Sequence, residues 1–363
     1  MSTVVTATAR PDVSVVSRRS VFAGPIVAIV TVLAALLATH AAGVPFTDPD
    51  HVGARRLALV CALVAVLVAL DIVVRATRRS GRSVPSLSAL RSVRRERWTA
   101  HRGVAVASAL VGFYVTYVAY RNLKSVVPLL RPGDLFDRQL ADADRALFGG
   151  SDPAELLHAV LGTGISTQIL STVYVTFVFF LPFSLAVALV FSPDLQGGIY
   201  YATALSVNWT IGAASYFLIP ARGPIYYAPG DFAALPDSHA AYLQRLLLDQ
   251  RREFLADPTA AGAAQNIAAF ASLHCSLLFT AALAAHLIGV GRRVRIALWA
   301  LFALSAVATV HLGWHYVLDD IAGVLIGLVA LVIARLLTGF EPRGGRVRRA
   351  TAPSQASTAP LSQ

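Results

Sequence analysis

The sequence predicts an all-α fold, a polytopic membrane helix bundle with about eight transmembrane helices. Of its 363 residues, 56% are hydrophobic and only 14% are charged, whereas about 25% of the residues of soluble globular proteins are charged. The apolar residues gather in stretches long enough to cross a bilayer, which takes about 20 residues. The 31 Lys and Arg residues gather between these stretches, as membrane topology requires.

The predicted spans follow one another along the chain and are joined by polar segments. Arg18 and Arg19 precede the first span, and no small-residue cleavage site follows it. We therefore expect a retained helix and not a signal peptide. The eight spans cover approximately residues 21–40, 56–75, 103–121, 165–191, 198–219, 266–289, 296–314 and 319–339.

The arginine distribution predicts the orientation of these spans. With the N-terminus inside, the inner segments hold 19 of the 31 Lys and Arg residues, so both termini should be cytoplasmic. The strongest signal is segment 75–102, which we expect to be a partly flexible basic loop.

The preference for Arg over Lys is typical of a GC-rich bacterial genome, so the membrane would be a plasma membrane. The net charge of +11 comes from Arg residues that lie between the spans, where membrane topology accounts for them. We therefore expect no nucleic-acid partner.

The two cysteines exclude some classes of site. Cys61 and Cys275 both lie in apolar stretches. The sequence therefore supports neither a disulfide framework nor a cysteine-based zinc site.

The stretch "VHLGWHYVLDD" places ionisable side chains where the chain is otherwise apolar. His311, His315 and Asp319 follow an i, i+4, i+8 spacing, which predicts one face of a single α-helix. In the predicted topology this stretch reaches the outer membrane boundary. "FASLHCS", the loop "YFLIPARGPIYYAPGDF" and the amphipathic segment 122–160 reach the same level. Four polar clusters, distant in sequence, should therefore converge outside.

These residue types suit phosphoryl transfer. An Asp one turn from a His fixes the orientation of the imidazole and stabilises its protonated form, so His315 with Asp319 makes a competent nucleophile or base. On a facing helix, His274 can protonate a leaving group. Cations on the same side can hold a phosphate. The candidate cations are Lys124, Arg131 and Arg222.

Here the sequence resembles a known family. "ASLHCS" followed by "HYVLDDIAG" is similar to the second and third signature motifs of the type 2 phosphatidic acid phosphatase superfamily, which contains membrane lipid phosphate phosphatases and phosphotransferases. With "NLKSVVPLLRPGDLFDRQLADADRALFGG" and "SYFLIPARGP", it resembles the subgroup of inositol phosphorylceramide synthases and their bacterial homologues over about residues 110–340. The resemblance implies that His315 is the nucleophile, Asp319 its partner and His274 the acid. It also implies a metal-independent reaction without a cofactor.

The phosphate ligands depart from the superfamily pattern. An Arg usually stands six residues before the nucleophilic His, but this position is Thr309, so the missing ligand must come from elsewhere. The first motif, a Lys followed after six residues by Arg-Pro, is matched by Lys124, Arg131 and Pro132. Arg222 in "PARGP" is the other candidate. Ser272 either hydrogen-bonds a phosphate oxygen or caps a helix.

The expected function is an integral membrane lipid phosphatase or phosphotransferase that acts through a phosphohistidine at the outer face, on a phospholipid or lipid phosphate. Hydrolysis is the first hypothesis, and transfer of a phospho-headgroup such as inositol phosphate to a lipid alcohol is the alternative. Two other classes stay open. One is a transporter or proton relay that uses His311, His315 and Asp319, and the other is a metal site built from the three histidines.

We expect four parts along the chain. These are a cytoplasmic tail (1–20), two N-terminal transmembrane helices with the basic loop (21–102), a six-helix catalytic membrane domain (103–340) and a disordered cytoplasmic tail (341–363). Segment 122–160 either lies flat on the outer surface or packs on the bundle as a connector. Within the site, His311 should only line the pocket and Asp320 should be structural.

Overall fold

The chain folds into a bundle of long helices, as expected. The computed structural model describes residues 17–48, 51–81, 83–192, 194–260, 262 and 264–342, and within these ranges it contains helices and no strand. The tail predictions for 1–20 and 341–363 lie almost wholly outside the described residues. Each of the eight predicted spans overlaps one apolar helix of the bundle. These helices are α1 (Arg18–Ala41), α2 (Val52–Ser80), α4 (Ala100–Leu130), α7 (Ile165–Phe191), α8 (Leu195–Leu218), α11 (Leu273–Ile288), α12 (Arg292–His311) and α13 (Val317–Thr338).

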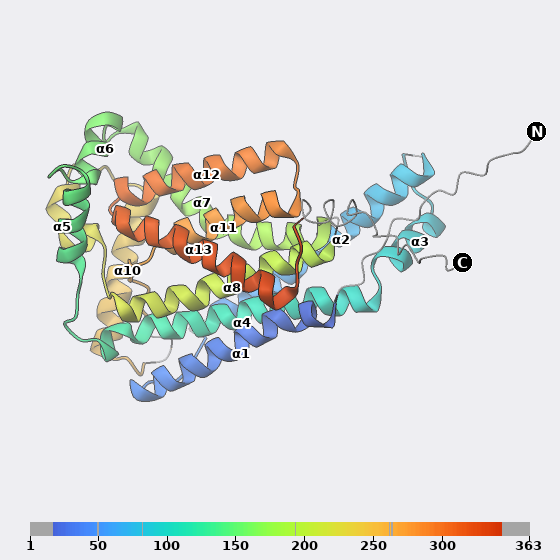
Figure 1. Cartoon of the computed structure of the whole chain (residues 1–363), viewed down its shortest axis with the longest axis horizontal. Helices are drawn as coiled ribbons and strands as arrows, with labels where there is room; N and C mark the ends of the chain where they lie inside the picture. The colour runs from blue at the N-terminus through green and yellow to red at the C-terminus, as the bar shows by residue number, and fades with distance from the viewer. Residues whose placement is uncertain are drawn as a thin grey trace, which may run out of the picture.

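Six of these helices are long and apolar enough to cross a membrane, which makes the chain a multi-pass membrane protein. The other two are α8 and α11. Helix α8 runs through the centre of the bundle (Figure 1) and is buried along most of its length. It therefore faces other helices instead of lipid, which explains why it tolerates Asn208, whose amide donates to Thr280 Oγ1 over 3.1 Å.

Helix α11 is shorter than expected, with 16 residues. The predicted start at residue 266 was wrong, because residues 266–272 run as non-helical chain beside the "PARGP" loop. Ala269 N donates to Ala221 O over 2.8 Å there, and Ser272 then caps the helix. The composition of 266–272 is as apolar as a helix, so hydropathy alone could not reveal the break.

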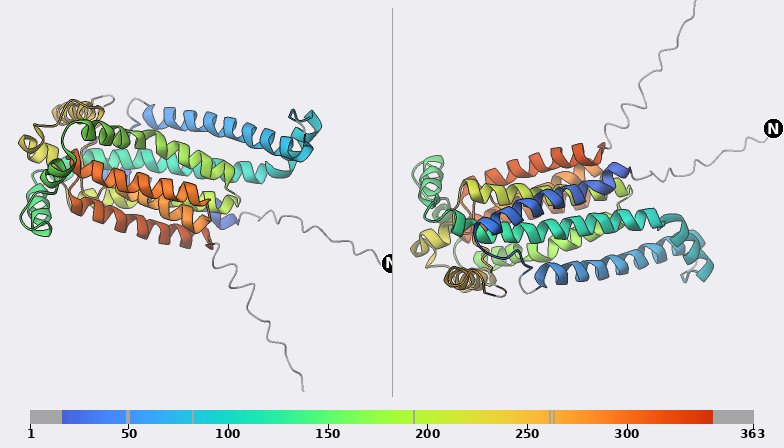
Figure 2. Two further views of the ribbon diagram at one scale, coloured as in Figure 1. Left: turned by 90° about the horizontal axis from the view of Figure 1, so that it is seen from above. Right: turned by 90° about the horizontal axis from the view of Figure 1, so that it is seen from below.

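The short helices gather at the two ends of the bundle (Figures 1 and 2). Helices α5, α6 and α10 lie at one end, and α3 lies at the other end with the last turns of α2. The first turn of α1 and the last turn of α13 also meet at the α3 end, where Ser20 Oγ donates to Thr338 O over 2.7 Å. The short elements are α3 (Leu87–Arg97), α5 (Asp137–Leu147), α6 (Pro153–Leu161), α9 (Pro224–Tyr227), the 3₁₀ turn η2 (Pro229–Phe232) and α10 (His239–Ala256).

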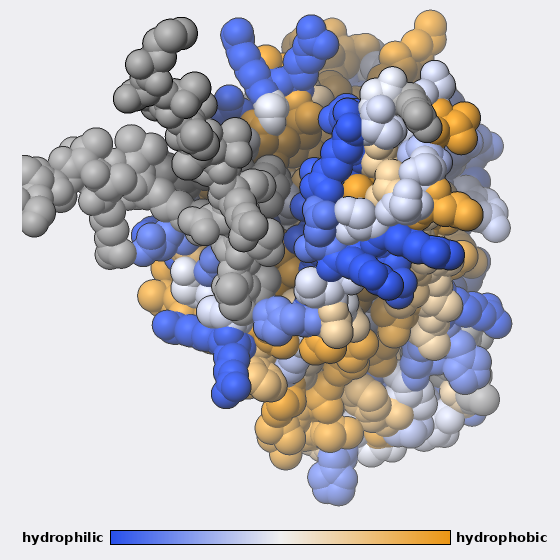
Figure 3. Space-filling model, turned by 90° about the vertical axis from the view of Figure 1, so that its right-hand side faces the viewer, coloured by the Kyte–Doolittle hydropathy of each residue, from blue (hydrophilic) through white to orange (hydrophobic). Residues whose placement is uncertain are grey.

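The arginine-rich segment 75–102, which we expected to be a partly flexible loop, is mostly helical in its described residues. Helix α2 continues to Ser80 and α3 occupies eleven of the following residues. Buried Asp71 provides the reason, because it accepts hydrogen bonds from Arg75 Nε at 2.8 Å and from Arg97 Nε at 2.7 Å. Figure 3 shows hydrophilic side chains gathered at this end of the molecule beside an apolar surface.

The approach of α13 to α11 depends on a glycine. A Cβ atom on Gly323 would lie 2.3 Å from Ser272 O, so only glycine fits at this contact.

We expect Gly323→Ala to lower the free energy of unfolding by about 1–3 kcal/mol, since overpacked cores must shift their backbone. Gly103→Ala in α4, where a Cβ would meet nothing within 4 Å, is the control and should be neutral or stabilising. Thermal unfolding of both variants in detergent measures the change in stability. Equal changes in the two variants would show that the contact between α13 and α11 does not require glycine.

Candidate functional site

The site is built around the turn that joins α12 to α13. Helix α12 ends at His311 and α13 begins at Val317, so the prediction of one continuous helical face was wrong. Gly313 has a φ of +73°, a conformation that glycine adopts without strain and that reverses the chain. The turn separates His311 from His315, whereas Asp319, in the first turn of α13, reaches back to His315 just before the helix begins.

His315 and Asp319 form a buried pair. His315 Nδ1 lies 3.3 Å from Asp319 Oδ2, and the same oxygen accepts the N–H of Tyr316 at 3.0 Å. Asp319 is fully buried and His315 is 7% exposed. The carboxylate thus serves two purposes, since it caps the first turn of α13 and orients the imidazole.

The protonation state of His315 suits a nucleophile. Burial lowers the pKa of His315 to about 4, because desolvation disfavours the charged imidazolium. The ring is therefore neutral at neutral pH. With Nδ1 facing Asp319, Nε2 is the nitrogen whose lone pair remains for attack.

His274 faces His315 from the first turn of α11. The two ring centroids are 6.4 Å apart. The His274 ring stacks on Tyr174 at 4.2 Å and contacts Phe177 at 4.1 Å. Trp314 stacks on the other side of this group, 4.9 Å from Tyr174. Aromatic neighbours on α7 therefore hold the second histidine in place.

Ser272 joins α11 to α13 and does not reach the cavity described below. Its Oγ accepts the N–H of Cys275 at 3.4 Å, and its own N–H donates to Asp319 O over 2.9 Å. This geometry favours the helix-capping alternative for Ser272 over direct contact with a phosphate.

Two aspartates of α5, which the sequence analysis did not single out, fix the loops of the site. Asp137 accepts the N–H groups of Arg222, at 3.0 Å, and Gly223, at 2.8 Å. The hydroxyl of Tyr316 donates to the same carboxylate over 3.2 Å. Asp137 thus ties the "PARGP" loop to the residue that follows His315.

Asp144 caps the helix that carries Asp319. Its carboxylate accepts the N–H groups of Val317 at 2.7 Å and Leu318 at 3.1 Å. Burial raises the pKa of Asp144, against the opposing effect of these two hydrogen bonds. The signal in the sequence was the spacing of Asp137, Leu140 and Asp144, which share the buried face of α5. This packing supports the connector alternative for segment 122–160.

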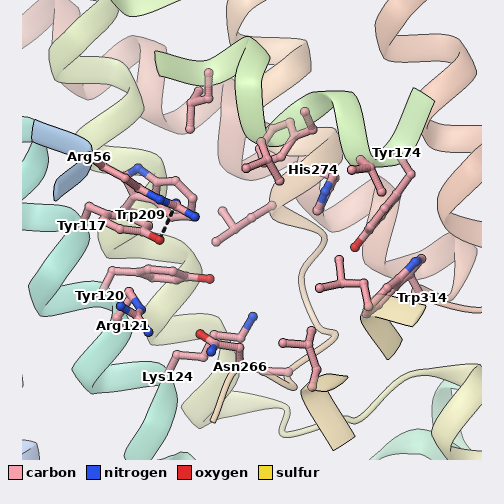
Figure 4. A pocket seen from close by; sticks show the side chains of 18 of the residues that line it. Arg56, Tyr117, Tyr120, Arg121, Lys124, Tyr174, Trp209, Asn266, His274 and Trp314 are labelled. Carbon is pink, nitrogen blue, oxygen red and sulfur yellow. Dashed lines mark hydrogen bonds between the residues drawn. The ribbon is translucent and has the colours of Figure 1, made fainter. Parts of the chain in front are cut away.

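A cavity of about 420 Å³ lies beside His274 and His315. Figure 4 shows His274, Tyr174 and Trp314 on one side of it and Arg56, Tyr117 and Arg121 on the other, with Lys124 and Asn266 below. Of the predicted site residues, four line this cavity. They are His274, His315, Lys124 and Arg222.

Lys124 and Arg222 are the predicted cations that reach the cavity. Lys124 Nζ lies over the ring of Tyr216, 5.0 Å from its centroid, and no ion pair involves it in the described part of the chain. Arg222 Nε lies 4.0 Å from Asp137 Oδ2, beyond hydrogen-bond distance. Both cations are therefore available to bind an anion.

Arg131 is placed differently. Its Nε donates to Asp134 Oδ2 over 2.8 Å, and its Nη1 donates to the carbonyl of Phe217 near the end of α8. It does not line the cavity. The structure thus brings together Lys124 and Arg222 but not Arg131.

Thr309 occupies the position where the superfamily motif has an Arg. Its Oγ1 donates to Asp320 Oδ2 over 2.8 Å. This hydrogen bond holds Asp320 within the contact between α12 and α13, in keeping with a structural role for Asp320. Because Thr309 is neutral, position 309 supplies no cation to the site.

His311 does not line the cavity, although the sequence placed it there. Its Nε2 lies 2.9 Å from Thr167 Oγ1, and its ring contacts His158 at 4.6 Å. It connects α12 to α6 and α7. No group of three His, Cys, Asp or Glu side chains suited to hold a metal ion occurs among the described residues, so the three-histidine metal site finds no support.

The aromatic and cationic wall opposite His274 was not predicted from the sequence. Arg56, Tyr117, Tyr120, Arg121 and Trp209 come from α2, α4 and α8. Their only signal in the sequence was the i, i+4 spacing of Tyr117 and Arg121, which places both on one face of α4.

A family model described as the PAP2 superfamily matches residues 138–333, more than half of the chain. The chain belongs to the PAP2 superfamily. The match includes His274, His315, Asp319 and Arg222, and it supports an activity of the phosphatase or phosphotransferase type. Lys124 and Arg131 precede it, as do α1, α2 and α4. No curated protein and no solved structure matches the chain significantly.

Asp144 gives a test of how the site is held. Removing a capping carboxylate costs up to about 2 kcal/mol, and Asp144→Ala leaves two half-buried N–H groups of α13 without a partner. We expect a loss of stability of this size, together with reduced turnover because His315 and Asp319 move. Asp142→Ala, on the exposed face of the same helix, is the control and should change neither. If thermal unfolding and turnover respond alike in both variants, the capping role is refuted.

Proposed function

We propose that this PAP2-superfamily protein is a membrane lipid phosphatase that works through a phosphohistidine at His315. The observation that carries the proposal is that His315 and His274 line one cavity, while Asp319 lies behind His315 with its carboxylate 3.3 Å from the imidazole. Nucleophile, orienting carboxylate and acid are the three groups that such a reaction requires.

Phosphoryl transfer would proceed in two balanced steps. His315 Nε2 attacks phosphorus, the bond from phosphorus to the lipid oxygen breaks, and His274 delivers a proton to that oxygen. Water then attacks the phosphorus, gives its proton back to His274, and the N–P bond breaks to release phosphate. Asp319 stabilises the positive charge on the His315 ring, while Lys124 and Arg222 hold the phosphoryl oxygens.

The opening of the cavity supports a lipid substrate. Leu59 of α2 and Phe179 of α7 line the cavity, yet they are 69% and 73% exposed on the outside of the bundle. The cavity therefore reaches the lateral surface between these two helices. A lipid could enter from the bilayer with its chains still in the hydrocarbon and only its headgroup at the histidines.

The charge distribution supports an outward-facing site. The site lies at the α5, α6 and α10 end of the bundle, whereas the arginines of α3 and of the last turn of α2 lie at the opposite end (Figure 1). Arginine-rich ends of membrane proteins stay on the cytoplasmic side. We infer a plasma-membrane protein whose site faces the extracytoplasmic side.

Transfer to a lipid alcohol is the second candidate. The cavity extends from the histidines to Arg56 on α2, which provides room for a headgroup or an acceptor besides the reacting phosphate. The likeness of "SYFLIPARGP" and "GWHYVLDDIAG" to inositol phosphorylceramide synthases points in the same direction. A relay through His311, His315 and Asp319 is not favoured, since the α12–α13 turn separates His311 from the other two.

Substitution of the histidines tests the proposal. His315→Ala should abolish phosphate release, and His274→Ala should reduce it by about 10²–10⁴-fold, the contribution of a general acid. The control is His286→Ala, which removes a histidine further along α11 that contacts Trp299 and should keep wild-type activity. Phosphate release from a panel of lipid phosphates is measured with and without a lipid alcohol. Full activity in folded His315→Ala would overturn the proposal, and a headgroup-bearing acceptor without free phosphate would decide for transfer.

A further inference from the structure

The cavity carries an unbalanced charge. Three arginines and one lysine line it, and within the described chain no Asp or Glu does. In the reaction proposed above, Lys124 and Arg222 hold the transferred phosphate, which leaves two arginines without a role. These are Arg56 of α2 and Arg121 of α4. Arg56 is exposed, whereas the side chain of Arg121 is only 11% exposed. Burying a cation beside apolar walls is costly unless an anion accompanies it.

The partners of these two arginines within the protein are weak or neutral. Arg56 Nη1 donates to the hydroxyl of Tyr117 over 2.7 Å. Arg121 Nη1 is buried and has no hydrogen-bond partner in the described residues, and it lies 3.9 Å from Asp48 Oδ1. The Asp48 carboxylate already accepts the N–H groups of Gly53 and Ala54 at the start of α2. Arg121 is therefore not fully neutralised.

A buried donor points to a ligand at the same place. Trp209 lines the cavity, is 6% exposed, and its Nε1–H finds no acceptor in the part of the protein that is described. Its ring packs against Tyr117 at 5.4 Å and Tyr120 at 4.5 Å. Buried indole N–H groups normally have a partner. The indole and the two guanidinium groups thus offer donors on one wall, as Figure 4 shows.

We propose that Arg56, Arg121 and Trp209 form a second anion-binding subsite, separate from the histidine end, for another negatively charged group of phosphate or carboxylate type carried by a lipid. The inference rests on the proposed function and names the substrate class, a lipid that presents two anionic groups. The subsite comes from α2, α4 and α8. Residues 56 and 121 precede the family match at 138–333, whereas Trp209 lies within it.

The anion has two sources. It belongs either to the reacting lipid or to a second, anionic lipid that sits at the opening beside Leu59 while the reaction proceeds. Arg56 lies one turn before exposed Leu59 on α2, so a headgroup from the bilayer can reach it. Both sources share the same chemistry and require the same arginines.

Lipid binding to an inactive protein tests the subsite without depending on turnover. Full-length His315→Asn is placed in phosphatidylcholine nanodiscs and titrated with two short-chain lipids, one with a single phosphate group and one with two. We expect the second lipid to bind at least about tenfold more tightly, since charge-assisted hydrogen bonds to Arg are strong. Adding Arg56→Gln or Arg121→Gln should remove this preference. Arg56→Lys should retain part of it.

Arg55→Gln is the matched control. Arg55 is the neighbouring arginine on α2 but does not line the cavity, so this variant should keep the full preference. Because Arg56 is exposed, Arg56→Gln should fold normally even if Arg121→Gln does not, and thermal unfolding checks both.

Nanodiscs that contain phosphatidylglycerol distinguish the two sources. If a second lipid fills the subsite, the single-phosphate lipid should bind more tightly in these nanodiscs, and Arg56→Gln should cancel the gain. Equal affinities for both lipids in both kinds of nanodisc, or a preference that survives Arg56→Gln, would overturn the subsite. Wild-type protein that shows the preference but releases no phosphate would instead refute the proposed function and leave the subsite standing.

Discussion

The arrangement of the site depends on how the first turn of α13 satisfies its backbone N–H groups. The first four N–H groups of a helix have no partner within it, and in an apolar bundle each unpaired group is costly. Here two buried carboxylates, those of Asp144 and Asp319, meet this need at the junction. Asp144 accepts from Val317 and Leu318, Asp319 accepts from Tyr316, and Asp137 binds the neighbouring loop.

This constraint also positions the proposed nucleophile and its partner. Because Asp319 must turn back to cap the helix, its carboxylate lies at the level of His315 and orients the imidazole. The N–H of Ser272 donates to the carbonyl of Asp319, which draws the start of α11, and with it His274, towards the same turn. The backbone pairing and the placement of the proposed catalytic groups therefore have one structural cause.

The fold and part of the site could be predicted from the sequence. Hydropathy located the long helices because lipid exposure imposes apolar stretches of fixed length, and α8 was found because its small and apolar residues pack at the centre. The pairing of His315 with Asp319 followed from their spacing. The chain reversal at Gly313 was missed, since i+4 periodicity continues across the turn and a single glycine does not reveal its φ. Asp137 and Asp144 were missed because their partners are backbone groups more than 80 residues away.

The cation assignment shows the same limit. Arg131 matches a motif position, but the carboxylate three residues later and a carbonyl of α8 occupy its guanidinium. Arg56 and Arg121 match no motif and yet line the cavity. Helix packing decides which arginines line the cavity. Their spacing along the chain does not predict this packing.

The central claim is that the phosphoryl group resides on His315 during turnover. The most direct measurement is mass spectrometry of the protein quenched at neutral to basic pH within the first turnovers on a lipid phosphate, with fragmentation of the peptide that spans the α12–α13 turn. The account predicts one phosphoryl group on His315, present only with substrate and lost as free phosphate accumulates. Turnover without any phosphorylated His315, or a phosphoryl group on His274 or His311 instead, would contradict it.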